Sequence, residues 1–198
     1  MRYDYQRFFE EKLRAVAEGD TILDIGGGER FQKALAPYRG IFKGKRYRTV
    51  DNSPAYHPDI VADAHALPLE DSSADGILCL SVLEHLSYPG TAVREMRRVL
   101  KPGGKALVFT HFIYPYHARP GVYADYFRFT QEGLASLFSE FSRVEMKKQG
   151  GYFRALGFFM PGQAALKPLW EPAAYLLDKL FSTEKHSTTM GYYLYAVK

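Results

Sequence analysis

Cysteine is almost absent from this chain of 198 residues, because Cys79 is the only one. No disulfide can therefore form within the chain, and this suits a reducing compartment. Cys79 lies in the apolar run from Gly76 to Leu80, where we expect a buried thiol of the core. Residues 1–10 lack the apolar centre of a secretory signal. We therefore expect a cytoplasmic protein.

Long apolar runs and strong charge are lacking as well. No apolar run reaches the roughly 18 residues that a membrane helix needs, so no membrane span is expected. The formal net charge is only +4, and no DNA- or RNA-binding motif is present. We therefore expect no nucleic-acid partner. The sequence has no internal repeat, and no feature indicates an oligomeric state.

The composition that is present describes an ordinary globular protein. Hydrophobic residues make up 46% of the chain and charged residues 24%, so residues 1–198 can form a single domain with a sizeable core. The 15 tyrosines and 14 phenylalanines are the unusual feature. Many lie in the second half, which indicates a pocket or a lid there, or alternatively an aromatic core.

Apolar spacing predicts strands that alternate with helices. The predicted strands cover residues 21–25, 46–50, 59–62, 74–80, 105–110, 143–147 and 192–197. The predicted helices cover residues 5–17, 29–35, 91–100 and 130–138, with Pro37 ending the second and Thr130 as N-cap of the last. This alternation is typical of an α/β fold with a doubly wound, mostly parallel sheet.

The segment of about 152–186 does not follow that alternation. It is rich in aromatic residues and proline, including Phe158, Phe159 and Trp170. We interpret it as a lid-like insertion before the last strand. The second interpretation, a patch that binds a membrane surface, is weaker because the segment has few basic residues.

Polar residues follow several predicted strands, where ligands of such sheets bind. Gly26, Gly27 and Gly28 come directly after the buried strand 21–25, so the backbone can approach a ligand closely there. A dinucleotide-binding loop would place a third glycine or alanine at position 31, where this chain has Phe31. This counts against an NAD-dependent oxidoreductase, which stays an alternative.

Two acidic positions strengthen the prediction of a nucleoside ligand. Asp51, at the end of the second strand, can accept hydrogen bonds from both hydroxyls of a ribose, although a turn residue is the alternative. Asp63 can accept a hydrogen bond from an adenine amino group, while the Ala64 amide faces a ring nitrogen. Nucleotide folds in general do not require an acid at this point.

The motifs together resemble those of class I S-adenosylmethionine (SAM)-dependent methyltransferases from about Thr21 to Val108. They stand in the family's order and spacing. They are Leu23–Gly28, Val50–Asp51, Ala62–Ala64 with Leu67–Pro68, Ser81–His85 and Arg97–Gly104. The resemblance implies a three-layer, Rossmann-like α/β fold, whose seven-stranded sheet is mostly parallel with its last strand antiparallel.

The same resemblance implies roles for single residues. Asp24, Gly26, Gly27 and Gly28 would hold the methionine part of SAM, and its product S-adenosylhomocysteine (SAH) in the same way. Asp51 would bind the ribose and Asn52 would lie beside the adenine, whose edge Asp63 and Ala64 would contact. Leu80 and Ser81 would offer backbone groups to the ammonium. Arg30 is a departure, because many relatives carry another glycine at that position.

Glu84 and His85 raise the question of a metal. Some relatives, such as ubiquinone-type O-methyltransferases, use a similar pair with further acids to hold one. Residues 81–83 contain no acid here, and two adjacent ligands make a poor site. We therefore predict no metal and a structural role for this pair near the cofactor.

The acceptor side is expected after the fifth strand. His111 and His117 are candidate general bases, because histidine titrates near neutral pH, but each can equally be a polar residue of the lining. Tyr114, Tyr126 and Arg128 are candidate substrate residues. Arg128 can instead pair with Asp125 or Glu132.

The predicted function is an enzyme that moves a methyl group from SAM to an O, N or C atom of a small or amphipathic acceptor. A lipid-linked or glycan acceptor is the second choice. A non-catalytic module that binds an adenosyl group or a partner is the alternative outside catalysis.

Overall fold

A seven-stranded sheet runs through the computed structural model, which describes residues 3–31, 33–185 and 188–198. Its strands are β1 Thr21–Ile25, β2 Arg46–Asp51, β3 Ile60–Val61, β4 Ala74–Leu80, β5 Leu100–His111, β6 Arg143–Lys148 and β7 Gly191–Val197. Their order across the sheet is β3-β2-β1-β4-β5-β7-β6. The pairings among β1 to β5 are parallel, and β7 is antiparallel to both β5 and β6. The predicted sheet with its antiparallel last strand is confirmed.

The order of the strands places a switch point between β1 and β4. The chain moves outward from β1 through β2 to β3 and then returns to pair β4 with the other side of β1. Connections leave in opposite directions at this point, so a crevice opens beyond the carboxyl ends of the two strands. The glycine loop and the Ser81–His85 motif follow these two strand ends.

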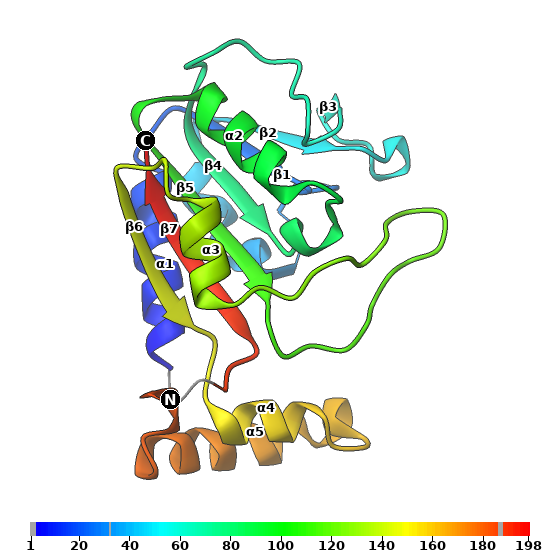
Figure 1. Ribbon diagram of the computed structural model, residues 1–198, viewed down its shortest axis with the longest axis vertical. Coiled ribbons are helices and arrows are strands. Elements are labelled where there is room, and N and C mark those ends of the chain that lie inside the picture. The colour runs from blue at the N-terminus through cyan, green and yellow to red at the C-terminus, as the bar shows by residue number, and fades with distance from the viewer. Residues whose placement is uncertain (1–2, 32, 186–187) are drawn as a thin grey trace.

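Helices cover both faces of the sheet (Figure 1). On one face lies α1 Asp4–Val16, and on the other lie α2 Pro89–Val99 and α3 Gln131–Leu137. Successive strand residues point to opposite faces, so Ile77 and Cys79 join the core under α2 and α3, whereas Leu78 joins the core under α1. Cys79 is buried, as predicted. The Thr130 hydroxyl caps α3 by accepting a hydrogen bond from the Gly133 amide at 3.1 Å.

One predicted helix is wrong. The sequence indicated a helix over residues 29–35 that ends before Pro37, whereas the structure has the 3₁₀-helix η1 Lys33–Phe42, which contains Pro37. Phe31 has a positive φ of 56°, which breaks a helix directly after the glycine loop. Proline lacks an amide hydrogen and clashes with the carbonyl of an α-helix turn, so the tighter 3₁₀ geometry accommodates it.

The segment predicted as an insertion forms a helical hairpin, α4 Tyr152–Phe158 and α5 Gln163–Leu180, followed by the 3₁₀-helix η4 Thr183–Lys185. Residue 186, the end of the predicted insertion, lies outside the described residues. The hairpin lies beyond the carboxyl end of β6, at the bottom of Figure 1. None of the helices within the described ranges is long and apolar enough to cross a membrane.

A buried carboxylate joins the two helices of the hairpin. Asp178 of α5 is fully buried, and it accepts hydrogen bonds from the amides of Gly151, Phe153 and Arg154 at 2.9–3.2 Å. These amides lie at the start of α4, where backbone N–H groups have no acceptor within their own helix. Asp178 therefore caps α4 from the neighbouring helix.

Candidate active site

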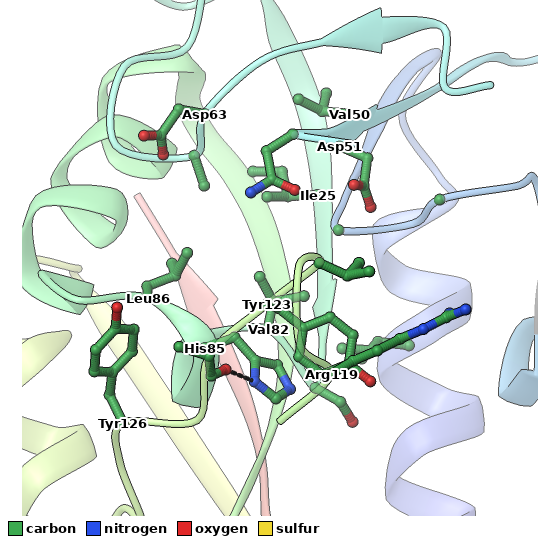
Figure 2. A pocket seen from close by; sticks show the side chains of 18 of the residues that line it. Ile25, Val50, Asp51, Asp63, Val82, His85, Leu86, Arg119, Tyr123 and Tyr126 are labelled. Atoms are coloured by element: carbon green, nitrogen blue, oxygen red, sulfur yellow. Dashed lines mark hydrogen bonds between the residues drawn. The ribbon is translucent and has the colours of Figure 1, made fainter. Parts of the chain in front are cut away.

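A cavity of about 680 Å³ lies beyond the carboxyl ends of β1, β2, β4 and β5 (Figure 2). This volume falls in the range of small-molecule sites. Most of the residues predicted to bind the cofactor line it: Gly26, Gly28, Asp51, Asn52, Asp63, Ala64, Leu80 and Ser81. Asp24 and Gly27 do not line the cavity. The switch point thus gathers segments that are far apart in the sequence.

The glycine loop fits its surroundings only without side chains. Gly26 and Gly28 have positive φ angles of 69° and 52°, which glycine adopts most readily. A Cβ atom at Gly26 would lie 2.3 Å from Cγ2 of Val82, and one at Gly27 would lie 2.4 Å from Oδ2 of Asp24. The loop is therefore pressed against the β4 motif on one side and Asp24 on the other. It leaves bare backbone facing the cavity.

Asp24 supports this loop from below as a buried carboxyl group. Its side chain accepts a hydrogen bond from the Tyr47 hydroxyl at 2.5 Å. Burial raises the pKa of Asp24 to about 7, the Tyr47 hydrogen bond opposes the rise, and the nearby charge of Asp51 adds to it. Asp24 can therefore change its charge near neutral pH when a cationic group comes close.

Two residues that follow the glycine loop, Arg30 and Phe31, have structural roles. Arg30, which replaces a glycine of many relatives, forms a bidentate pair with Asp59 at 2.6 and 3.1 Å. Asp59 also accepts a hydrogen bond from the Thr49 amide at 2.8 Å. The ring of Phe31 packs on that of Tyr47 with centroids 4.4 Å apart. Both residues thus fasten the loop to β2.

Asp51 and Asp63 lie on the same wall of the cavity (Figure 2). Oδ1 of Asp51 accepts a hydrogen bond from the Ser53 amide at 2.9 Å, just before the 3₁₀-helix η2 Pro54–Tyr56. Oδ1 of Asp63 accepts one from the His65 amide at 2.9 Å. Among the described residues, Oδ2 of neither aspartate accepts a hydrogen bond. Each side chain is oriented by its own turn and keeps an oxygen for a ligand.

Ser81 turns the chain out of the sheet after β4. It has a positive φ of 59°, and its amide donates to the Phe109 carbonyl at 2.8 Å. The chain then enters the 3₁₀-helix η3 Leu83–His85. A serine in the left-handed region is uncommon and is held here by the neighbouring strand. This turn places Leu80 and Ser81 on the cavity wall and Glu84 behind it.

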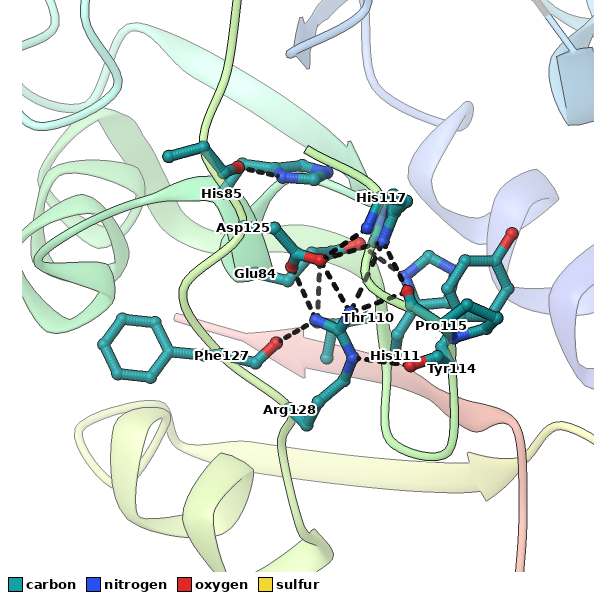
Figure 3. Close-up of polar contacts among 11 residues, drawn as sticks. Glu84, His85, Thr110, His111, Tyr114, Pro115, His117, Asp125, Phe127 and Arg128 are labelled. Atoms are coloured by element: carbon teal, nitrogen blue, oxygen red, sulfur yellow. Dashed lines mark hydrogen bonds and ion pairs between the residues drawn. The ribbon is translucent and has the colours of Figure 1, made fainter. Parts of the chain in front are cut away.

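Glu84 and His111 form a buried pair in which His111 lines the cavity and Glu84 lies behind it (Figure 3). Glu84 accepts hydrogen bonds from the Thr110 hydroxyl at 2.8 Å and from Nδ1 of His111 at 2.5 Å. Burial raises the pKa of Glu84, but these hydrogen bonds outweigh it, so its pKa lies below the ordinary value. Nδ1 of His111 donates its hydrogen to this carboxylate, so the neutral ring keeps its lone pair on Nε2. His111 lines the cavity and can accept a proton there.

His85 and His117 are the other imidazoles of this wall. Nδ1 of His85 donates to the Ala124 carbonyl at 2.6 Å, and Nδ1 of His117 lies 3.1 Å from the Pro115 carbonyl. Burial lowers the pKa of His117, which favours its neutral form. Both rings line the cavity together with His111.

Glu84, His85 and His117 also offer ligand atoms within 4.8 Å of one another, as a metal site would. Both oxygens of Glu84 already accept hydrogen bonds, which weakens this set of donors. The absence of a resident metal stays a prediction.

Arg128 does not line the cavity, although it was a candidate substrate residue. Its guanidinium pairs with both oxygens of Asp125 at 2.5 and 2.7 Å, and it donates to the carbonyls of Tyr114 and Pro115. The hydrogen bonds from Arg128 also hold the pKa of Asp125 well below its usual range. Arg128 therefore fixes the shape of the loop, and pairing with Asp125 was the alternative left open. Tyr114 and Tyr126 do line the cavity.

Several lining residues were not predicted from the sequence. They are Tyr56, His65, Arg119 and Tyr123, together with His85, which was assigned only a structural role. The first four follow β2, β3 and β5 and gave a weak signal, since they lie several residues beyond the strand ends. The partnership of Glu84 with His111 was also missed. Glu84 follows β4 and His111 ends the neighbouring strand β5, which is the signal that could have joined them.

The helical hairpin is a neighbour of the cavity. Of its described residues, 152–185, none lines the cavity. Phe158 of α4 nevertheless packs on the lining residue Tyr114, with ring centroids 5.2 Å apart. The lid-like role of the hairpin stays a prediction. Through this contact, the hairpin would affect the position of Tyr114 in the cavity wall.

Comparison with known sequences gives a family match. Residues 23–108 match the family model described as a methyltransferase domain. A ubiquinone/menaquinone biosynthesis C-methyltransferase of Pseudomonas entomophila is 32% identical over 115 residues, which cover 50% of this chain and 45% of that protein. An uncharacterised 37.1 kDa protein in a transposon of Streptomyces fradiae is 35% identical over 46% of this chain and 30% of its own length. The chain thus spans less than half the length of these curated relatives.

Solved structures give the same fold. A SAM-dependent methyltransferase from Archaeoglobus fulgidus aligns with a TM-score of 0.60 at 16% identity, over 98% of this chain and 100% of that one. The [4+2]-cyclase SpnF aligns with a TM-score of 0.55 at 22% identity, over 100% of this chain and 83% of that one. The fold therefore carries more than one kind of reaction among its known members.

Proposed function

We propose that this chain, whose residues 23–108 match a methyltransferase domain, is a class I SAM-dependent enzyme that methylates a small acceptor molecule. SAM is the cofactor of this class. The observation that carries the proposal is one cavity with two chemically different walls. The glycine loop and Asp51 stand on one wall, and His111, oriented by Glu84, stands on the other.

The residues present fit an adenosyl cofactor. Gly26 and Gly27 leave no room for a side chain, and Gly26 and Gly28 line the cavity, so the loop presents bare backbone there. Asp51 and Asp63 each keep a carboxylate oxygen that can accept from hydroxyl or amino groups. We assign Asp51 to the ribose, Asn52, Asp63 and Ala64 to the adenine, and the loop with Leu80 and Ser81 to the methionine part. Asp24 acts on that part through the loop that it supports.

When bound by the glycine loop, Asp51 and Asp63, SAM would supply an electrophilic methyl group on a positively charged sulfur that is a good leaving group. The protein has to align the two reactants, and orientation alone can lower the barrier by about 7–11 kcal/mol at most. An acceptor that carries a proton must also lose it. His111 takes this proton at Nε2, and Glu84 stabilises the imidazolium that forms. His117 is the second candidate base.

The first test is calorimetric titration of the purified protein with SAH, with NAD as the comparison. We expect micromolar binding of SAH and none of NAD. The variant Asp51→Ala should remove the SAH signal while the protein stays folded by circular dichroism. A folded wild-type protein that does not bind SAH would contradict the proposal.

Turnover separates an enzyme from a non-catalytic adenosyl-binding module. Release of SAH from SAM is measured over a panel of phenols, amines and carbon acids. An acceptor that gives release dependent on His111 supports the enzyme. SAH binding without release for any acceptor would favour the non-catalytic module.

A further inference from the structure

The two walls of the cavity differ in charge (Figure 2). Asp51 and Asp63 stand on the cofactor wall, while His85, Tyr123 and Arg119 stand opposite. Among the described lining residues, Arg119 is the only lysine or arginine. The opposite wall therefore offers a permanent positive charge to a second molecule that binds in the part of the cavity not filled by the cofactor.

Arg119 is held in place by a tight turn. The amide of Arg119 donates to the Tyr123 carbonyl at 2.9 Å, and the amide of Tyr123 donates back at 3.0 Å. Pro120, Gly121 and Val122 form the turn between them, in which Gly121 has a φ of 75° and the Val122 amide donates to the Arg119 carbonyl at 2.9 Å. The backbone pairing fixes where Arg119 and Tyr123 leave the loop, so both side chains stand at one end of the opposite wall.

The guanidinium of Arg119 is not used by a carboxylate of the described chain. Its one side-chain hydrogen bond runs from Nη1 to the Tyr56 hydroxyl at 3.0 Å. The guanidinium of Arg128, on the same loop, by contrast donates its hydrogen bonds to Asp125 and to backbone carbonyls. A guanidinium has five N–H donors and matches a carboxylate or a phosphate in two-point fashion. Arg119 therefore keeps most of its donors for an anion.

A row of rings connects Arg119 to the proposed base. Tyr123 lies 4.4 Å from His85, His85 lies 4.8 Å from His117, and His117 lies 5.2 Å from His111, measured between ring centroids. These separations are those of stacked or edge-on aromatic pairs. A flat ring is the kind of molecule that packs along such a wall, with one end near Arg119 and the other near His111.

We propose that the acceptor is an anionic hydroxylated aromatic compound. Arg119 binds its carboxylate or phosphate group, and its hydroxyl group faces His111. This inference rests on the proposed methyltransferase function and adds the class of acceptor to it. The competing role for Arg119 is to bind the carboxylate of the cofactor's methionine part, and the experiment separates the two.

The test is calorimetric titration of the SAH-saturated protein with phenol, 4-hydroxybenzoate and 4-hydroxyphenyl phosphate. The three probes share a phenol and differ in the anion, so they distinguish carboxylate from phosphate. We expect at least one anionic probe to bind about tenfold or more tightly than phenol, as a charge-assisted pair predicts. Arg119→Gln should reduce that preference to about twofold or less, and Arg119→Lys should retain part of it.

The controls show where the loss arises. Arg94→Gln removes a similar charge from α2, outside the cavity, and should leave all affinities unchanged. Arg119→Gln should leave the Kd for SAH unchanged within about twofold, and circular dichroism should confirm its fold.

Three outcomes would contradict, in turn, the acceptor class, the role of Arg119 and the proposed function. Anionic probes that bind no better than phenol, or no binding of any probe, would overturn the acceptor class alone. A large loss of SAH affinity in Arg119→Gln would assign Arg119 to the cofactor. A folded wild-type protein that does not bind SAH would overturn the proposed function itself.

Discussion

Nδ1 of His111 lies 2.5 Å from Oε1 of Glu84, although the two residues are 27 positions apart in the sequence. Glu84 is fully buried, and Thr110 occupies its other oxygen. The free oxygen of the carboxylate therefore bonds to the imidazole of His111 and fixes the orientation of that ring.

Glu84→Gln should lower kcat by about 10²–10⁴, because glutamine holds the ring of His111 without stabilising its protonated form. His111→Ala should have an effect of similar size, and the double variant should lose little more than either single variant. The Kd for SAH, measured by calorimetry, should stay unchanged. Full activity in both single variants would show that the pair is structural.

Asp24 should make stability depend on pH. Its pKa rises from 3.8 to about 7 in the folded protein, mainly through burial, so the native state keeps a proton that the unfolded state releases between these values. The stabilisation is present below pH 3.8 and is lost as the pH rises through about 7. We expect it to amount to a few kcal/mol.

Urea unfolding of the wild type and of Asp24→Asn between pH 4 and 8 measures this contribution. The free-energy difference between the two proteins should fall as the pH rises through this range. Tyr47→Phe removes a hydrogen bond that favours the charged form, so the loss should extend to higher pH. A difference that is constant with pH would contradict the raised pKa of Asp24.

Gly27→Ala should damage the cofactor site, because the new Cβ would lie 2.4 Å from Oδ2 of Asp24. We expect a loss of about 1–3 kcal/mol in unfolding free energy and a weaker Kd for SAH. Gly40→Ala is the matched control, since a Cβ there meets nothing within 4 Å. Equal behaviour of the two variants in thermal melting and calorimetry would disprove the tight fit.

Substitutions in the hairpin should have two different effects, a loss of stability at Trp170 and a loss of acceptor affinity at Phe158. Trp170 is buried, and its indole donates to the Gln163 carbonyl at 2.8 Å, so Trp170→Ala should cost about 3–5 kcal/mol of stability. Phe158→Ala should leave the protein folded but weaken binding of the best acceptor found by screening, because Phe158 packs on Tyr114. Phe181→Ala, an exposed aromatic elsewhere on the hairpin, serves as control. If Phe158→Ala leaves acceptor affinity unchanged, the hairpin is not a lid.

Removal of metal should not affect the protein. Both oxygens of Glu84 already accept hydrogen bonds, so we expect SAH binding and turnover to survive dialysis against EDTA. Elemental analysis of the purified protein should find no stoichiometric metal. Activity that is lost in EDTA and restored by zinc or magnesium would show that Glu84, His85 and His117 hold an ion.

Local sequence patterns predicted much of the fold. The strand 21–25 and the glycines after it were correct because an apolar run followed by Gly26–Gly28 leaves few backbone alternatives. Thr130 was correctly placed as an N-cap because capping involves only residues within one turn. The helix at 29–35 was wrong because the positive φ of Phe31 depends on its packing with Tyr47 and Phe42, which are distant in the sequence.

The sequence by itself determined the seven strands, the helices α1, α2 and α3, the family resemblance and the residues at each strand end, since these depend on periodicity and on short motifs. Only the tertiary structure decided which of those residues meet. It joined Glu84 to His111, used Arg128 internally, and placed Arg119 opposite Asp51. The physical reason is that side-chain partnership depends on the packing of neighbouring strands and loops, whose separation in space is not encoded in local spacing.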